Sequence, residues 1–152
     1  QIGTSLSLSE DGNTLALGAI LSDVDEYDPQ GLGLSLPGPG YAKIMDYDAA
    51  AQEWMMRGNR IDGIDQEMFG RSISLSWDGS TVAVGAYNPF TRNDTSLDLH
   101  GRTVVYVWND TEASWTQLGQ DIPGSSGKVK CLSLSADGRS FAVVARATWN
   151  EE

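Results

Sequence analysis

Large apolar residues alternate with serines in three short stretches of the chain. The stretches SLSLSEDGNTLALGA, SISLSWDGSTVAVGA and CLSLSADGRSFAVVA begin at residues 5, 72 and 131. In each stretch the alternation stops at an Asp-Gly pair and then resumes. An alternation with a period of two is typical of a β-strand, and Asp-Gly between two strands favours a tight hairpin turn. Each stretch therefore predicts a β-hairpin with large residues on one face and Ala, Gly or Ser on the other.

A second type of segment occurs twice. GYAKIMDYDAAAQEWMMRGNRIDG, from residue 40, aligns without a gap with GRTVVYVWNDTEASWTQLGQDIPG, from residue 101. The part DAAAQEWMMRGN, taken alone, has strong helix formers, but its counterpart NDTEASWTQLGQ has no such preference. Because the two copies must share one shape, we expect a strand, a polar turn and a second strand in both.

Four strands in a unit of roughly 60 residues are typical of a β-propeller blade. Each blade packs on both sides, so a bulky face must nest against the small face of its neighbour. We expect an all-β fold with about two and a half four-stranded antiparallel blades. Blade 1 is expected at about residues 3–63, blade 2 at about 70–124 and half of blade 3 at about 128–147. Such a set does not close a ring, so we expect the chain to be a piece of a longer protein. Its partners are then other blades of the same propeller or neighbouring subunits.

Short motifs carry a resemblance to known propellers. Phe69-Gly70, Asp78-Gly79 and the AVGA that ends at residue 86 together resemble the FG-GAP repeat, the blade of integrin-α-type propellers. The first copy keeps Gly3 and an LGA ending, whereas the third ends in VVA. The calcium-binding members of that family have three spaced acids before Asp-Gly, where this chain has Ser-Glu, Ser-Trp and Ser-Ala. The resemblance covers nearly all of the chain but does not imply calcium at these turns.

The same turns are also similar to two other propeller motifs. They resemble the Asp box of sialidase-type propellers, with one residue missing between Asp and Gly, and the turn of WD-repeat blades. GRTVVYVWND, from residue 101, is similar to the third strand of a WD-repeat blade. All of these resemblances imply a propeller, and none implies one particular function.

Charge and sequons narrow the setting of the protein. A net charge of -11 and a pI near 4.3 argue against a nucleic-acid partner and against insertion into a membrane, because anionic surfaces repel such a chain. No apolar run approaches the roughly 18 residues of a membrane span, and no signal peptide is recognisable at the start. Two Asn-x-Thr sequons, at Asn93 and Asn109, favour a glycoprotein that is secreted or on the cell surface. The alternative is a cytoplasmic protein, and the single Cys131 does not decide between them.

One acidic segment is a candidate metal site. Asp23, Asp25, Glu26 and Asp28 lie close together in the connection between the two halves of the first unit. Calcium takes roughly six to eight oxygen ligands, but the spacing of an EF-hand is absent. We favour a solvated acidic loop and keep calcium on Asp23, Asp25 and Asp28 as the alternative. No other cofactor is predicted, and His100, the only histidine, lacks the neighbours that a catalytic triad or a zinc site needs.

The aromatic residues divide into two groups. Trp54 and Trp115 occupy equivalent positions, so we expect a repeated anchor between blades rather than a carbohydrate-stacking surface. Trp77 occupies a turn position where the other copies have Glu10 and Ala136. An aromatic residue that does not repeat and lies on a turn is a candidate for contact with a ligand.

These features favour a non-catalytic binding or structural module, such as an adhesion protein. Its frame repeats, while the segments 20–39 and 87–100 differ in length and sequence, as expected for a scaffold that presents variable loops. The expected ligand is a protein or a glycan, and no catalytic residue is predicted. The alternatives are a propeller hydrolase that acts on glycans, with its active site mostly outside these residues, and an intracellular WD-like scaffold.

Overall fold

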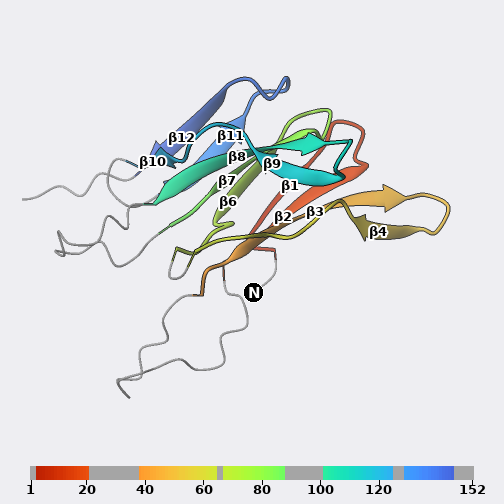
Figure 1. Ribbon diagram of the computed structural model, residues 1–152, viewed down its shortest axis with the longest axis horizontal. Helices are drawn as coiled ribbons and strands as arrows, with labels where there is room; N and C mark the ends of the chain where they lie inside the picture. Colours follow the sequence, from red (N-terminus) through yellow and green to blue (C-terminus); the bar gives the residue numbers. More distant parts are fainter. Residues whose placement is uncertain (1–2, 21–37, 65–66, 88–100, 125–128, 146–152) are drawn as a thin grey trace, which may run out of the picture.

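A computed structural model describes residues 3–20, 38–64, 67–87, 101–124 and 129–145 of the chain. The described residues form three antiparallel β-sheets, which we call blades 1, 2 and 3 (Figure 1). Blade 1 contains β1 (Ser5–Leu8), β2 (Thr14–Ala19), β3 (Tyr41–Asp48), β4 (Glu53–Met56) and β5 (Ile61–Asp62). Blade 2 contains β6 (Ser72–Leu75), β7 (Thr81–Gly85), β8 (Arg102–Asn109), β9 (Ser114–Gln117) and β10 (Ile122–Pro123). Blade 3 contains β11 (Val129–Leu134) and β12 (Phe141–Ala145).

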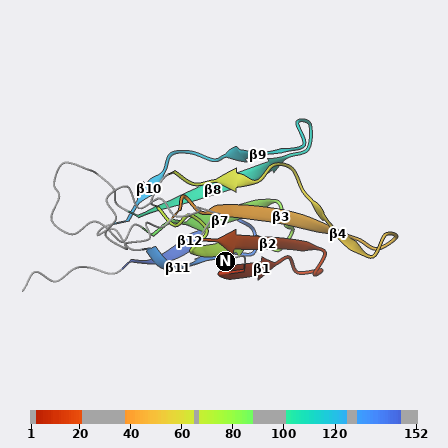
Figure 2. The same cartoon turned by 90° about the horizontal axis from the view of Figure 1, so that it is seen from below.

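Blades 1 and 2 have the same topology. In blade 1 the strands follow the order β1-β2-β3-β4, and the short β5 also pairs with β3. In blade 2 they follow β6-β7-β8, with both β9 and β10 paired to β8. The first strand of each blade contacts the first strand of the next, so that β6 lies between β1 and β11. Two antiparallel five-stranded sheets and one β-hairpin, stacked in this way, confirm the all-β fold and the antiparallel blades predicted from the sequence (Figure 2).

The segment with strong helix formers is a turn and a strand. Residues 49–52 form the turn, and β4 follows it. Tyr47 of β3 pairs with Trp54 of β4 in the same register in which Trp108 pairs with Trp115 in blade 2. The repeat therefore predicted this element correctly, and local helix propensity did not, because cross-strand pairing and packing override a weak local preference.

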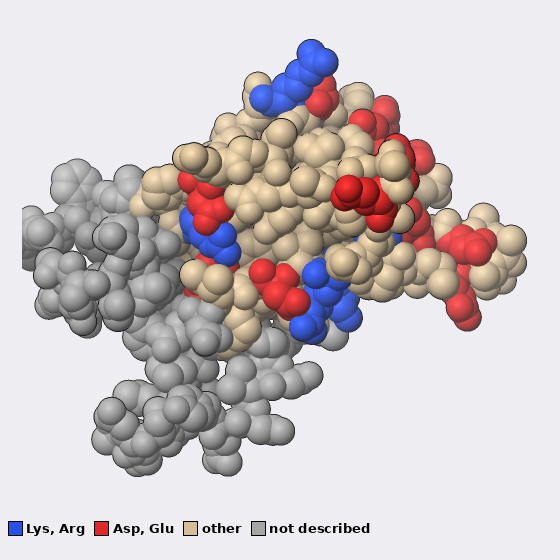
Figure 3. Space-filling view, viewed as in Figure 1, with Lys and Arg blue, Asp and Glu red and all other residues tan. Residues whose placement is uncertain are grey.

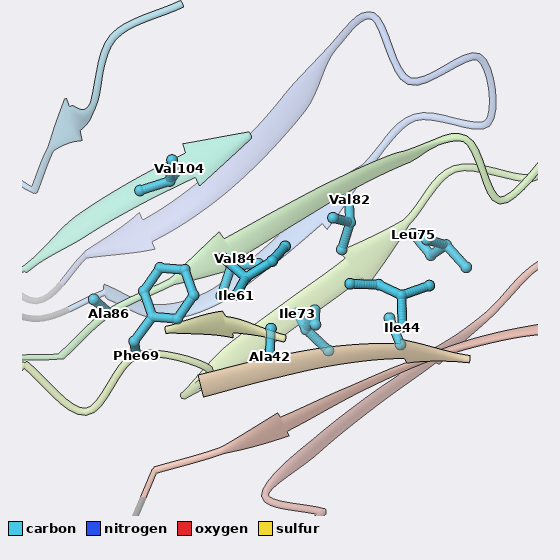
Figure 4. Close-up of a cluster of buried hydrophobic side chains, with 11 residues drawn as sticks. Ala42, Ile44, Ile61, Phe69, Ile73, Leu75, Val82, Val84, Ala86 and Val104 are labelled. Atoms are coloured by element: carbon cyan, nitrogen blue, oxygen red, sulfur yellow. The ribbon is translucent and has the colours of Figure 1, made fainter. Parts of the chain in front are cut away.

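The core lies between the blades. One cluster joins small residues of blade 1 to large residues of blade 2, and Figure 4 shows side chains of the two blades pointing toward one another. Ala16 and Ala42 of blade 1 belong to one buried cluster with the large residues of blade 2, namely Ile73, Leu75, Val82, Val84 and Val104. A second cluster joins Ala83 and Val105 of blade 2 to Leu134 of blade 3. The predicted nesting of bulky faces on small faces is thus confirmed at both junctions.

The Asp-Gly turns also contribute to these junctions. Gly79 has a φ of 69°, and a Cβ atom added there would lie 2.9 Å from the Cβ atom of Thr14 in blade 1. Gly138 of blade 3 approaches Thr81 of blade 2 in the same way. The glycine is therefore required twice, once for the positive φ of the turn and once for the close approach of the next blade. No helix long and apolar enough to cross a membrane occurs in the part of the chain that the structure describes.

Gly79→Ala and Gly12→Ala separate these two requirements. Gly12 has a φ of 71° but nothing within 4 Å of an added Cβ atom. We expect Gly12→Ala to lower the free energy of unfolding by about 1 kcal/mol, the cost of a left-handed alanine. Gly79→Ala should cost at least about 1 kcal/mol more, because Thr14 must also move. Urea unfolding followed by tryptophan fluorescence measures both, and equal losses would contradict the packing role of Gly79.

Candidate binding surface

The two ends of the blades differ in their connections. The tight turns within residues 9–13, 49–52, 76–80, 110–113 and 135–140 all lie at one end, which we call the turn end (Figure 1). The antiparallel order places the last residues before and the first residues after the β2–β3 and β7–β8 connections at the opposite end, which we call the loop end. The variable segments 20–39 and 87–100 belong to these two connections.

At the turn end, three Asp-Gly turns have the same hydrogen bonds. In blade 2 the Ser76 hydroxyl donates to Asp78 Oδ1 at 2.6 Å, and Ser76 Oγ accepts from the Thr81 N–H at 2.9 Å. The Ser80 N–H also donates to Asp78 Oδ1 at 3.0 Å. Asp11 with Ser9 and Asp137 with Ser135 repeat this arrangement. Each carboxylate is thus bound to the polar groups of its own turn.

These hydrogen bonds change the acidity of the three carboxyl groups. The Ser76 hydroxyl and then the Ser80 N–H stabilise the Asp78 carboxylate and lower the pKa of Asp78 below its ordinary value. The Ser9 and Ser135 hydroxyls have the same effect on the pKa of Asp11 and of Asp137. A carboxyl group with a lowered pKa stays ionised at neutral pH, which suits a structural acceptor and not a general acid.

Trp77 lies in the middle of the row of turns. Its N–H donates to the Ala136 carbonyl at 3.0 Å, and its carbonyl accepts from the Glu10 N–H at 2.9 Å, so the backbones of the three turns are joined. The side chain of Trp77 remains 58% exposed. Acidic side chains gather around the turn end (Figure 3), where Glu10, Asp11, Asp48, Glu53, Asp78, Asp110, Glu112 and Asp137 are exposed. Trp77 remains a candidate contact residue in an acidic setting.

An arginine joins blade 1 to the aromatic pair of blade 2. The Arg57 guanidinium lies 4.8 Å from the ring centroid of Trp108 and 5.8 Å from that of Trp115. The Trp115 indole N–H donates to the Arg57 carbonyl at 2.8 Å, and the two tryptophan rings are 5.4 Å apart. A cation over an indole face is attracted by the ring quadrupole. Trp115 therefore contacts the neighbouring blade, as predicted for an anchor. Trp54, predicted to be an equivalent anchor, is instead 36% exposed and lies against Tyr47 of its own blade.

A buried ion pair stabilises the link between blades 1 and 2. Glu67 is 4% exposed and accepts two hydrogen bonds at 2.8 Å from Arg102, one to each carboxylate oxygen. The Ile64 N–H donates to Glu67 at 3.0 Å, and Asp121 accepts from Arg102 at 2.6 Å. Hydrogen bonds to Glu67 raise the pKa of the Arg102 guanidinium further above its usual range. The geometry is that of a bidentate structural pair and leaves no free acid or base.

At the loop end, backbone pairing holds the residues that flank each variable segment. Ala19 pairs with Tyr41 where β2 and β3 diverge, and Gly40 forms a parallel bridge with Phe69, which is completely buried. In blade 2 the Ala86 N–H donates to the Arg102 carbonyl at 2.8 Å. Each variable segment therefore leaves and re-enters the sheet at positions fixed by backbone hydrogen bonds.

Several predicted site residues lie outside the described residues. These are Asp23, Asp25, Glu26 and Asp28 of the proposed calcium loop, Asn93 and His100. Asn109 is described at the end of β8, where its side-chain oxygen accepts from the Thr111 N–H at 3.0 Å. Among the described residues no group of three or more His, Cys, Asp or Glu side chains could hold a metal ion.

Sequence reasoning missed Arg57, Glu67 and Arg102. Their equivalents in the other unit, where the alignment provides one, are Leu118 for Arg57 and Tyr41 for Arg102. A search for repeated residues passes over such positions. A different signal was available in the alignment. At both positions an arginine in one unit is replaced by an apolar or aromatic residue in the other unit.

Comparison with known proteins supports the fold. No family model and no curated protein matches the chain. The periplasmic gluconolactonase PpgL of Pseudomonas aeruginosa is similar in structure, with a TM-score of 0.56 and 18% identity over 91% of this chain. The match covers 35% of the gluconolactonase, so the chain spans about a third of its length. Together with the stacked sheets, this likeness shows that the described residues form part of a β-propeller.

Two further structures give weaker matches. Hydrazine synthase of Kuenenia stuttgartiensis matches with a TM-score of 0.47 and 14% identity, over 94% of this chain and 29% of that one. A chain of the mitotic checkpoint complex matches with a TM-score of 0.46 and 16% identity, over 93% of this chain and 47% of that one.

Removing the charge of Glu67 should destabilise the protein strongly. In Glu67→Gln the neutral amide leaves the Arg102 guanidinium without its bidentate partner, so we expect a loss of about 3 kcal/mol in the free energy of unfolding. Asp121→Asn is the matched control, because Asp121 is 45% exposed and contacts the same arginine. That variant should lose less than about 1 kcal/mol. Chemical denaturation measures both, and similar losses in the two variants would contradict a buried pair.

The acid sensitivity of the turns has a defined sign. Because the pKa of Asp78 is lower in the folded chain than its ordinary value of 3.8, the ionised carboxylate stabilises the fold above that pH. This stabilisation is lost as the pH falls through the folded-state pKa. Ser76→Ala removes the strongest donor to Asp78 and should flatten the pH dependence of the unfolding free energy between about pH 5 and pH 2. Identical pH slopes for Ser76→Ala and the unchanged chain would contradict this origin.

Proposed function

We propose that the chain is a non-catalytic binding module that contacts a protein or a glycan through segments 20–39 and 87–100. The observation that supports this proposal is that the residues flanking both segments, Ala19 with Tyr41 and Ala86 with Arg102, are joined by backbone pairing at the loop end of adjacent blades. Binding residues of many proteins lie on variable loops that a regular scaffold supports. The two segments lie largely outside the described residues, so the proposal is supported by the residues that flank them.

The polar groups of the frame favour binding over catalysis. The three turn carboxylates are bound to serine hydroxyls and backbone N–H groups, and Glu67 is bound to Arg102. A catalytic carboxyl group needs an unoccupied side toward its substrate and a pKa suited to proton transfer. The gluconolactonase shares the fold at 18% identity, and a fold alone does not carry an activity.

The proposed setting is extracellular. The similarity of Phe69-Gly70 and the AVGA motif to the FG-GAP repeat, with the sequons at Asn93 and Asn109, supports a secreted or surface glycoprotein that takes part in adhesion. Calcium at Asp23, Asp25 and Asp28 stays the alternative to a solvated acidic loop. Glycopeptide mass spectrometry of the protein from its native source tests the setting, and unmodified Asn93 and Asn109 would count against it.

Replacing each variable segment tests the proposed function. We expect the fluorescently labelled chain to bind to a glycan array or to intact cells, and to lose binding when residues 22–37 or 89–99 are replaced by a Gly-Ser linker of equal length. The substitution Leu118→Ser, at an exposed position outside both segments, is the control and should leave binding unchanged. Protease and glycosidase treatment of the cells then distinguishes a protein ligand from a glycan. Turnover of a lactone or glycan panel by the chain, or binding that survives both replacements, would overturn the proposal.

A further inference from the structure

The side chain of Trp77 is exposed although its blade has described neighbours on both sides. Its exposed fraction is 58%, while its backbone is bound by the turns of blade 1 and blade 3. The indole N–H of Trp77 makes no hydrogen bond within the described residues. By contrast, the indole N–H of Trp108 donates to Asp110 and that of Trp115 to the Arg57 carbonyl. Trp77 therefore offers the solvent an aromatic ring and a polar donor.

The turn itself does not require a tryptophan at this position. Glu10 and Ala136 occupy it in the other two turns. All three residues join the row through backbone N–H groups and carbonyls, so a glutamate or an alanine serves the turn equally well. Tryptophan is one of the residues that contribute most to the binding energy of protein interfaces. A tryptophan that the turn does not need, held on a fixed backbone, fits a contact residue.

Carboxylates lie next to Trp77 along the row of turns. Glu10 follows on one side, the turn of Asp137 on the other, and Asp78 is the next residue in the chain. The Glu10 carboxylate accepts no hydrogen bond within the described residues. Both hydrogen bonds that Asp137 accepts from its own turn go to Oδ1. Oxygen atoms that can accept from a ligand are thus available on either side of the indole.

The charge around Trp77 is mostly negative. Within residues 9–13, 76–80 and 135–140 the charged residues are four acids and one base, all of them exposed: Glu10, Asp11, Asp78, Asp137 and Arg139. Figure 3 shows further acidic side chains gathered at this end of the molecule. Because such a surface repels anions and attracts cations, the partner that complements it is basic.

We propose that the turn end binds an arginine-rich segment of a partner protein, with one guanidinium stacked on the Trp77 indole and donating to the Glu10 carboxylate. A planar guanidinium can stack on an aromatic ring and donate hydrogen bonds in its own plane, which the compact ammonium of lysine cannot do. The chain contains one such contact already, because the Arg57 guanidinium lies 4.8 Å from the Trp108 ring centroid. The surface is at the opposite end from segments 20–39 and 87–100, so this inference does not rest on the proposed function.

Titration of the isotope-labelled chain with a Gly-Arg-Gly-Arg-Gly peptide, followed by NMR of the indole N–H groups, tests this contact. The chain has five tryptophans, and the resonance that is absent in Trp77→Ala is that of Trp77. We expect this resonance to shift most as peptide is added. Trp77→Ala should weaken binding about tenfold, the loss expected for a cation–π contact at an interface. Its fold should survive, because alanine occupies the same position in the third turn.

Three controls separate a specific contact from attraction to an acidic chain. Glu10→Gln should weaken binding about threefold, whereas Asp121→Asn removes a carboxylate that pairs with Arg102 and should leave the affinity unchanged. Replacement of residues 22–37 and 89–99 by Gly-Ser linkers should also leave it unchanged, which distinguishes this site from the loop end. A Gly-Lys-Gly-Lys-Gly peptide of equal charge should bind at least about threefold more weakly.

Four results overturn the proposal. The Trp77 resonance does not shift, or binding survives Trp77→Ala. Equal losses in Glu10→Gln and Asp121→Asn would mean that net charge alone attracts the peptide. Equal affinity for the lysine peptide would exclude a stacked guanidinium.

Discussion

The fold depends on the nesting of a bulky sheet face against the small face of the next blade. A single antiparallel sheet such as blade 1 or blade 2 has two faces and cannot bury either by itself, so its stability comes from its neighbours. Ile73 and Leu75 reach exposures of 6% and 5% only because Ala16 and Ala42 leave room for them. Serines of the alternating strands also join the blades, since their hydroxyl oxygens accept hydrogen bonds from backbone N–H groups in the first strand of the next blade. Alternation along a strand is thus a pattern of contacts between blades.

Polar residues at the turn end support this packing. Asp78 holds its turn through Ser76 and Ser80, and the turn brings Gly79 against Thr14 of the preceding blade. A side chain with such a role is already bound on its functional oxygens, and its lowered pKa reflects those bonds. The recurrence of Asp-Gly in this chain is therefore explained by geometry. The turn end consists of repeated hydrogen-bonded turns, whereas the connections at the loop end differ in length and sequence.

The sequence predicted the fold well, because a repeat reports the contacts that every unit shares. The alignment of residues 40–63 with residues 101–124 identified β4 correctly against its local helix propensity. It also identified Trp115 as an anchor between blades. The same logic failed for Arg57, Glu67 and Arg102, since each serves one junction. A residue that meets its partner across a junction and has no counterpart in the other unit leaves no periodic signal, and only the three-dimensional arrangement brings it together with its partner.

These unique residues have a physical purpose in a repeated structure. If every junction were identical, any blade would fit any other, and the chain could pair its sheets in the wrong order. Arg57 covers Trp108 and Trp115 at the first junction, whereas the equivalent position in blade 2 is Leu118. The bidentate pair of Glu67 with Arg102 likewise has no aligned counterpart, because Tyr41 replaces the arginine in blade 1. The shared nesting supplies the stability of the stack, and among the described residues these charged contacts occur at the first junction and not at the second.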